Sequence, residues 1–548
     1  MDRSGTALIF MLAILLTING ALFSYLQIAT GYNAPTTVYA KLIDSQSRLM
    51  SVPYNPTPSL WSWRSTLFWE QSYPLPAIIE VMLSSVLGTD LTYGFLMPVL
   101  ASNMIFPFVW ARSLGWKNKY ALAYSITLIS YLASITTISR HTFGEYLLYA
   151  SFVPLFMLVG GKIRRSRELL VLILLFLLPL AFSHQGFLGF ATAGLVALSF
   201  ASWGTRDSRG KVFSVAGLFS VFLFLFVNPF ILYAKEWGYV PTSLGDLFLR
   251  FETLLTAIWL HNVLQVPYTG GALLINPPRP EAYNWVSHVF VGTKVIFGLS
   301  AVVIVCICLA RILTRRQSRR PLGKREIVAF LIVGSMMFDA LSYSLIFLSI
   351  PVGLAAGLGP LLLPTTVGRL EHKPLALRRR VISKATRFLT PVFLCIITIS
   401  SCFMLTGIPI FGSGASYPFE AYSTAPMSHF LAAHSDRLVI MGTPDSTSKV
   451  FAYLPVTKIT EVDTVRYGTE VYLLSEAMQG SQSELNQVFV RTGANAWVLT
   501  RSEFEHVVWG EVAGYSVPPF SSYATAETDA RLNMVYSSSN AMLLVVSQ

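Results

Sequence analysis

The sequence predicts an α-helical polytopic membrane protein of about eleven transmembrane helices with a small C-terminal α/β domain. Three observations lead to this fold class. The 548-residue chain is 53% hydrophobic and only 12% charged, which is too apolar for an ordinary soluble protein. Apolar runs long enough to cross a bilayer recur up to about residue 410. Clusters of Lys and Arg occupy alternate gaps between those runs, which is the positive-inside pattern.

The predicted spans follow from length and hydropathy. About 20 apolar residues cross a hydrocarbon core of about 30 Å. The first span follows Arg3 and is interpreted as a retained helix, because no clear small-residue cleavage site ends it. The eleven spans are 7–30, 91–111, 120–139, 146–161, 168–183, 186–203, 212–233, 289–312, 327–349, 351–368 and 388–409.

The basic clusters set the expected orientation. They occupy 162–167, 315–325 and 378–387, and all three fall in the cytoplasm when the N-terminus is cytoplasmic. The net charge of +12 therefore reflects topology, and we expect no nucleic-acid partner. The sequence has no N-x-Ser/Thr sequon, which favours the plasma membrane of a prokaryote.

Two domains are expected. Residues 1–410 form the transmembrane domain, with long outward loops at 31–90 and 234–288. The first loop ends in the apolar stretch Pro76–Leu83, which we interpret as a helix lying along the membrane interface. Residues 411–548 form the extracytoplasmic domain.

The outward domain has a more polar composition. Strand-like runs and one helix-like stretch alternate in it, which predicts an α/β domain with a partly parallel sheet. The expected strands are 438–441, 470–474, 496–500 and 541–546, and the expected helix is 484–491. No Gly-rich phosphate loop, metal-spaced His/Cys set or GxSxG motif occurs in this domain, so we expect an accessory role.

Ionisable residues near the outer ends of the spans are the candidate site. Asp44 lies in the first loop, Arg140, His141 and Glu145 lie in the turn before the fourth span, and His184 lies in the turn after the fifth. A carboxylate can act as general base on a hydroxyl, and Arg and His can bind phosphate. The same residues can instead be polar groups in hydrated turns.

Other carboxylates compete with Asp44 for a catalytic role. Glu70 lies in the same loop, and Glu80 lies on the otherwise apolar interfacial stretch. Asp339 lies near the middle of the ninth predicted span, where a carboxylate is costly unless it is functional, protonated or paired, for instance with Tyr343.

Two segments carry a resemblance to a known family. They are Tyr73–Gly88, with its Tyr-Pro-Leu-Pro start and Leu-Gly end, and the turn Ser139–Glu145. In this layout the chain resembles the GT-C superfamily of polytopic glycosyltransferases, which use lipid-phosphate-linked sugars. The resemblance implies that Asp44 is the first-loop catalytic acid, with Glu145 as the second acidic position. It also implies that Arg140 or His184 meets the donor phosphate, with His141 beside them.

The leading hypothesis is a membrane glycosyltransferase with a GT-C-like transmembrane domain and a polyprenyl- or dolichyl-phosphate sugar donor. Its other partners would be membrane lipids and an acceptor glycan, lipid or protein. The first loop has no acidic pair and the chain has no WWDxG-like sequence, so the acceptor and the need for a divalent metal stay open. The alternatives are a transporter or lipid flippase, and a non-catalytic membrane scaffold with an extracellular binding domain.

Overall fold

The computed structural model describes the residues that form most helices, the strands and a few turns. Predicted positions outside these residues include the first and last spans, the strand at 470–474 and Glu70. The described residues are 35–47, 71–88, 96–118, 120–122, 124–125, 140–160, 166–184, 186–205, 207–227, 274–275, 284–314, 321–342, 357–362, 418–434, 439–441, 450, 454, 463–465, 481–500, 507–508, 530–538 and 541–546.

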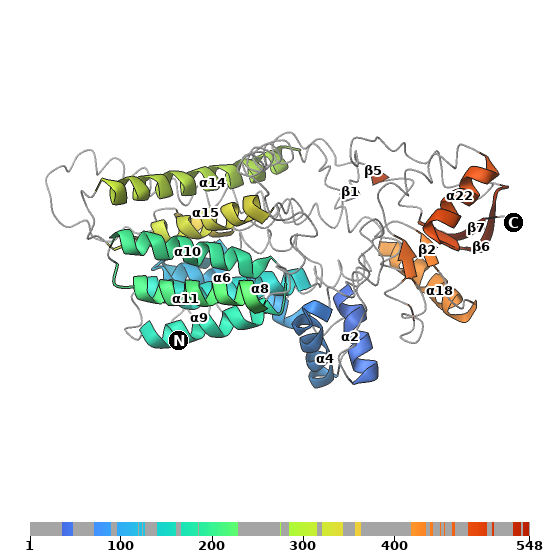
Figure 1. Cartoon of the computed structure of the whole chain (residues 1–548), viewed down its shortest axis with the longest axis horizontal. Coiled ribbons are helices and arrows are strands. Elements are labelled where there is room, and N and C mark those ends of the chain that lie inside the picture. The colour runs from blue at the N-terminus through green and yellow to red at the C-terminus, as the bar shows by residue number, and fades with distance from the viewer. Residues whose placement is uncertain are drawn as a thin grey trace.

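A bundle of helices forms the larger part of the described chain. Its members run side by side along the long axis of the molecule (Figure 1). They are α6 (Leu96–Ser113), α8 (Arg140–Gly160), α9 (Ser166–Ala181), α10 (Phe187–Thr205), α11 (Gly210–Phe222) with its π-helical continuation η1 (Leu223–Val227), α14 (Asn284–Leu313) and α15 (Lys324–Ser342).

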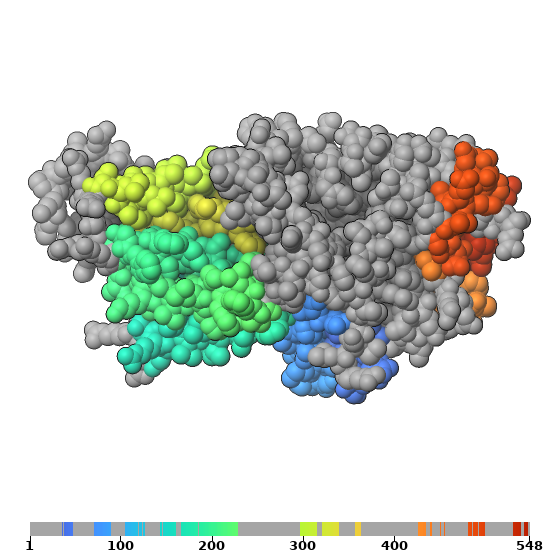
Figure 2. All heavy atoms as spheres, viewed as in Figure 1, coloured from blue at the N-terminus to red at the C-terminus, as the bar shows by residue number. Residues whose placement is uncertain are grey.

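Three described helical segments are long and apolar enough to cross a membrane. They are Phe187–Thr205, Gly210–Val227 and Ile296–Leu313. Their large apolar side chains also lie exposed on the outside of the bundle, including Leu218 and Phe226, which are 72% and 76% exposed. Figure 2 shows α11 and α14 at the surface of the bundle. An apolar surface of this extent indicates lipid contact. The chain is therefore mostly helical and membrane-embedded, while the count of eleven spans stays a prediction.

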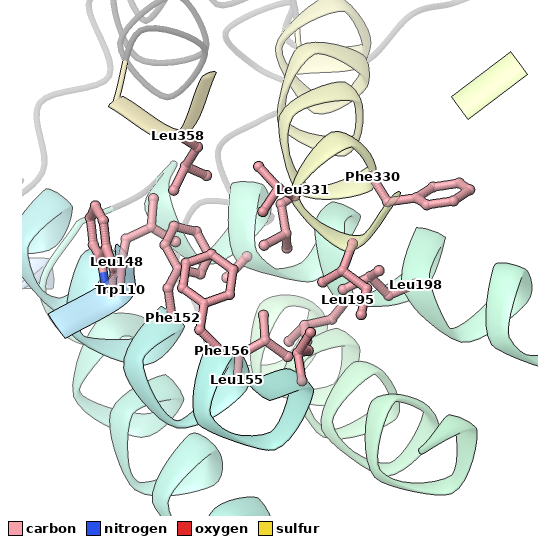
Figure 3. Close-up of a cluster of buried hydrophobic side chains, with 14 of the residues drawn as sticks. Trp110, Leu148, Phe152, Leu155, Phe156, Leu195, Leu198, Phe330, Leu331 and Leu358 are labelled. Atoms are coloured by element: carbon pink, nitrogen blue, oxygen red, sulfur yellow. The ribbon is translucent and has the colours of Figure 1, made fainter. Parts of the chain in front are cut away.

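Aromatic and aliphatic side chains fill the interior of the bundle. Trp110 of α6 is fully buried, and its indole N–H donates a hydrogen bond to the Tyr149 carbonyl of α8 at 3.1 Å. Phe152 and Phe156 lie edge-on to the Trp110 ring (Figure 3). Leu195 of α10 and Leu331 of α15 belong to the same hydrophobic cluster.

Polar contacts close one end of the bundle, which we call the Asp207 end. Arg209 binds the Asp207 carboxylate at 2.6 Å, and the Leu322 N–H donates to the same carboxylate at 3.0 Å. The Lys324 ammonium donates to the Leu114 carbonyl at 2.9 Å. These residues come from gaps that the sequence predicts to lie on one side of the membrane.

Two helices stand between the bundle and the C-terminal part of the chain (Figure 1). They are α2 (Pro35–Gln46), which was not expected, and α4 (Leu75–Leu87), which confirms the predicted helix at Pro76–Leu83. The stripe Pro76, Ala77, Glu80 and Ser84 is the buried face of α4. Its location at the membrane interface stays a prediction.

The C-terminal part contains a mixed five-stranded sheet in the order β3-β2-β4-β7-β6. The pairs β2–β3 and β2–β4 are parallel, and the pairs β4–β7 and β6–β7 are antiparallel, as expected for a partly parallel sheet. Its elements are α18 (Pro418–His434), β2 (Val439–Met441), β3 (Asp463–Val465), α22 (Gln482–Thr492), β4 (Ala496–Thr500), β6 (Leu532–Ser537) and β7 (Ala541–Val546).

A short strand pair and a 3-10 helix are also present among the described residues. The strand β1 (Leu274–Ile275) pairs antiparallel with β5 (Val507–Val508). This pair joins the predicted second outward loop to the C-terminal part of the chain. The 3-10 helix η4 (Gly359–Leu362) is buried against α14 and α15.

Candidate functional site

The end of the bundle opposite Asp207 brings three predicted segments together. We call it the His184 end, and it is defined by Leu75, Gly144, Phe182 and His184. The Leu75 N–H, at the start of α4, donates to the Phe182 carbonyl at 3.3 Å. The turn that contains Phe182 also packs against the first turns of α8. The evidence is the short distance between Gly144 of α8 and His184 of this turn.

Gly144 allows α8 to lie directly against His184. A Cβ placed on Gly144 would lie 2.8 Å from the Cβ of His184 and 2.7 Å from the Cδ2 of Phe187. Both distances are shorter than a carbon–carbon contact at optimal separation. A glycine is therefore required at this position for the two segments to approach so closely.

His184 is held in a defined orientation. Its side chain is buried, and its ring lies 4.8 Å from the Phe187 ring in an edge-on arrangement. The Gly186 N–H donates to Nδ1 of His184 at 3.1 Å. With Nδ1 accepting, the proton of the neutral imidazole is on Nε2.

The residues Arg140, His141 and Glu145 differ from expectation in their secondary structure. The sequence predicts a turn for them, whereas all three lie in the first turns of α8. The helix begins earlier than predicted because Phe143 and Leu147 are buried in the bundle core and favour a helical register there. Arg140 precedes Gly144 by one turn, and Glu145 follows it directly. The positions of these three polar side chains lie outside what the structure describes.

Asp44 lies on a separate element. It occupies the last turn of α2 and is exposed to solvent, whereas the preceding Leu42 and Ile43 are buried. Its proposed catalytic role stays a prediction. Glu80 is fully buried on α4, and Glu70 lies outside the described residues.

Asp339 lies closer to one end of the bundle than the sequence suggests. It follows Phe338 directly on α15. The Phe338 ring packs on Gly189 and lies 5.0 Å from the Phe190 ring, near the start of α10. The backbone of Asp339 is therefore displaced toward the His184 end.

A metal site is not apparent in the described part of the chain. Within those ranges, no three His, Cys, Asp or Glu residues gather closely enough to hold a metal ion. Glu70 and the rest of 48–70 lie outside the described residues.

Comparisons with known proteins find similarity among solved structures, but no match among protein families or curated proteins. The crystal structure of the Archaeoglobus fulgidus oligosaccharyltransferase, tethered to an acceptor peptide with the NVT sequon, aligns over 98% of this chain and 74% of its own. The TM-score is 0.46 and the sequence identity is 9%. Similarity at this level does not place the chain in a family.

Proposed function

We propose that this protein is a GT-C-type membrane glycosyltransferase that uses a polyprenyl- or dolichyl-phosphate-linked sugar. The acceptor would be a glycan, lipid or protein at the outer face of the membrane. The observation that supports this most directly is the approach of Gly144 to His184. It brings the helix that begins with Arg140 and His141 against a buried imidazole at one end of an apolar bundle.

The His184 end suits a lipid-linked phosphate. The exposed apolar surface of the bundle would hold the isoprenoid chain among the membrane lipids, which leaves the phosphate at the membrane boundary. There, Arg140, His141 and His184 would donate hydrogen bonds to the phosphate oxygens. Such donors stabilise the charge that develops on the leaving phosphate.

The proposed reaction requires a base for the acceptor. The acceptor oxygen forms a bond to C1 of the sugar while the bond from C1 to the phosphate oxygen breaks. The electron pair of that bond leaves with the phosphate, and the acceptor proton passes to the carboxylate of Asp44. Asp44 is exposed, so an acceptor can reach it, and its helix is anchored by a buried face. Glu145 would be the second acidic group.

The described core gives less support to a transporter. A transporter requires a polar binding site near the middle of the bilayer. In the described bundle, the space between α8, α10 and α15 is filled by side chains such as Phe156, Leu195 and Leu331 (Figure 3). Catalysis at one end of the bundle needs no such central site.

The test is sugar transfer from radiolabelled polyprenyl-phosphate sugars in membranes. Wild type would be compared with Asp44→Asn at matched protein level, with Glu168→Gln as a control. Glu168 is also an exposed carboxylate, but it lies in the first turn of α9, remote from the His184 turn. We expect transfer by wild type and the control, and a loss of roughly 100-fold or more in Asp44→Asn.

Equal transfer by Asp44→Asn would remove Asp44 from the mechanism and direct attention to Glu70 and Glu145. Absence of transfer with every donor tested would overturn the proposed function and favour the transporter or the scaffold.

A further inference from the structure

One hydrophobic cluster joins the helix of Asp44 to the C-terminal sheet. It contains buried residues of α2, α4, α18 and three strands, together with two buried residues from the segment between β2 and β3. Its members are Val38, Tyr39, Ala40, Leu42, Ile43, Ala77, Met427, Leu431, Ile440, Val450, Leu454, Ala496, Val498 and Leu543. The first loop and the C-terminal part therefore share one core.

The order of α2 depends on this shared core. A helix of 12 residues is marginal in water on its own, so α2 must gain its stability from packing. Tyr39 and Leu42 are 0% and 3% exposed, and they belong to the cluster. Asp44 follows Leu42 by two residues, so the packing of α2 also sets where the Asp44 carboxylate lies.

The neighbouring helix α4 connects the same core to the His184 end. Its Ala77 is buried in the shared cluster, whereas Leu75 and Ile79 pack against the core of the bundle. The Leu75 N–H binds the carbonyl of Phe182, two residues before His184. The pair α2–α4 thus lies between the C-terminal domain and the turn that holds the predicted phosphate ligand.

We propose that the C-terminal domain is a positioning element of the transferase. Through the shared cluster it holds Asp44 in place relative to the sugar donor. This inference rests on the proposed function. Leu431 of α18 is a positioning residue in this arrangement, since it is 2% exposed and belongs to the same cluster as five residues of α2. The domain would thus contribute to the rate of transfer without contacting the reacting atoms.

The first arm of the test does not depend on activity. Amide hydrogen exchange of α2 would be measured in the full chain for wild type, Leu431→Ala and the control Val490→Ala, whose valine on α22 is 82% exposed. We expect exchange in α2 to accelerate roughly tenfold in Leu431→Ala, with α10 unchanged. Unchanged exchange in α2 would overturn the inference, whether or not the protein transfers sugar.

The second arm measures transfer. Leu431→Ala should lower kcat roughly tenfold while the KM for the lipid donor stays within about twofold, and Leu431→Met should restore most of the rate because it conserves volume. In the Asp44→Asn background, Leu431→Ala should cause no further loss, because its effect passes through Asp44.

The outcomes of the two arms separate the inference from the proposed function. Faster exchange in α2 with normal transfer, or an additive loss in the double variant, would overturn the positioning role. If wild type transfers from no donor, the proposed function fails and the positioning role fails with it. The exchange arm would then still decide whether the domain holds α2.

Discussion

Gly334 of α15 lies against the backbone of Gly194 of α10. A Cβ placed on Gly334 would lie 2.8 Å from the Cα and 2.9 Å from the N of Gly194. Both atoms belong to backbone, so no side-chain rotation can relieve the contact. Small residues allow such close approach of helices in membranes, where packing replaces the hydrophobic effect as the force between them.

The first prediction concerns this crossing. Gly334→Ala should lower the free energy of unfolding by about 2 kcal/mol, because the added methyl forces the two helices apart. The measurement is the unfolding temperature in detergent. The control is Gly298→Ala on α14, where the nearest atom to the new Cβ is Met336 Cε at 3.9 Å. Equal unfolding temperatures of the two variants would contradict the close approach of α15 to α10 at Gly334.

The second prediction concerns the candidate site. Gly144→Ala should lower sugar transfer on the order of 10- to 100-fold, because the new Cβ displaces His184 from α8 and misplaces a phosphate ligand. The measurement is transfer from the lipid-linked donor at matched protein level. Gly323→Ala is the control, since the nearest atom to its new Cβ would be Glu326 Oε2 at 3.4 Å, an ordinary contact distance, at the Asp207 end. Full activity of Gly144→Ala would show that the close packing of His184 against α8 is not needed for sugar transfer.

The third prediction concerns the position of α4 at the membrane. Val86 and Met82 of this helix are 81% and 60% exposed, and their neighbour Leu87 is also exposed. An amphipathic helix places such side chains between the lipid headgroups. An environment-sensitive fluorophore on Val86→Cys should therefore show blue-shifted emission in nanodiscs.

The matched control for α4 is Val490→Cys. Val490 is 82% exposed, as Val86 is, but it lies on α22 of the C-terminal domain. Its label should emit as in water. Both labels would be placed in a variant without the native cysteines. Water-like emission at both positions would show that α4 does not lie in the membrane interface.

Local signals predicted several elements closely. The strands β4 and β7 have the bounds expected from their apolar runs. The helix α22 contains the expected helix 484–491, and it begins after a capping box in which Ser481 and Glu484 bind each other's backbone N–H. In contrast, β3 has three residues and starts with Asp463, so no periodicity marks it. The edge strand β6 is largely exposed and lacks a clear alternation.

Contacts between distant segments could not be predicted in the same way. The alternation of basic gaps predicted that the turn of His184 and the residues before the fourth span share one side. It could not predict that Gly144 meets His184, because that contact depends on the packing of α8. Asp207 was missed altogether. An acidic residue beside Arg209 in a short gap is typical of a solvated turn, and its partner Leu322 lies 115 residues away.

The last prediction follows from the charge of Asp207. Burial alone would raise the pKa of this carboxyl, but hydrogen bonds from Arg209 and the Leu322 N–H hold the pKa below its ordinary value. Because the folded pKa is the lower one, the contribution to stability is complete above the unfolded pKa of about 3.9. It is lost as the pH falls through the folded pKa.

Asp207→Asn should therefore lower the free energy of unfolding at pH 7, by roughly 3 kcal/mol, because the partly buried Arg209 contact and the hydrogen bond from Leu322 are both weakened. The difference in unfolding temperature between wild type and Asp207→Asn should be constant from pH 7 to 5 and shrink below about pH 4. Glu168→Gln, which removes an exposed carboxylate of α9, is measured over the same range as the control. A difference in unfolding temperature that grows as the pH falls would contradict this prediction. It would mean that the pKa of Asp207 is raised in the folded protein, so that the carboxyl binds Arg209 and Leu322 in its protonated form.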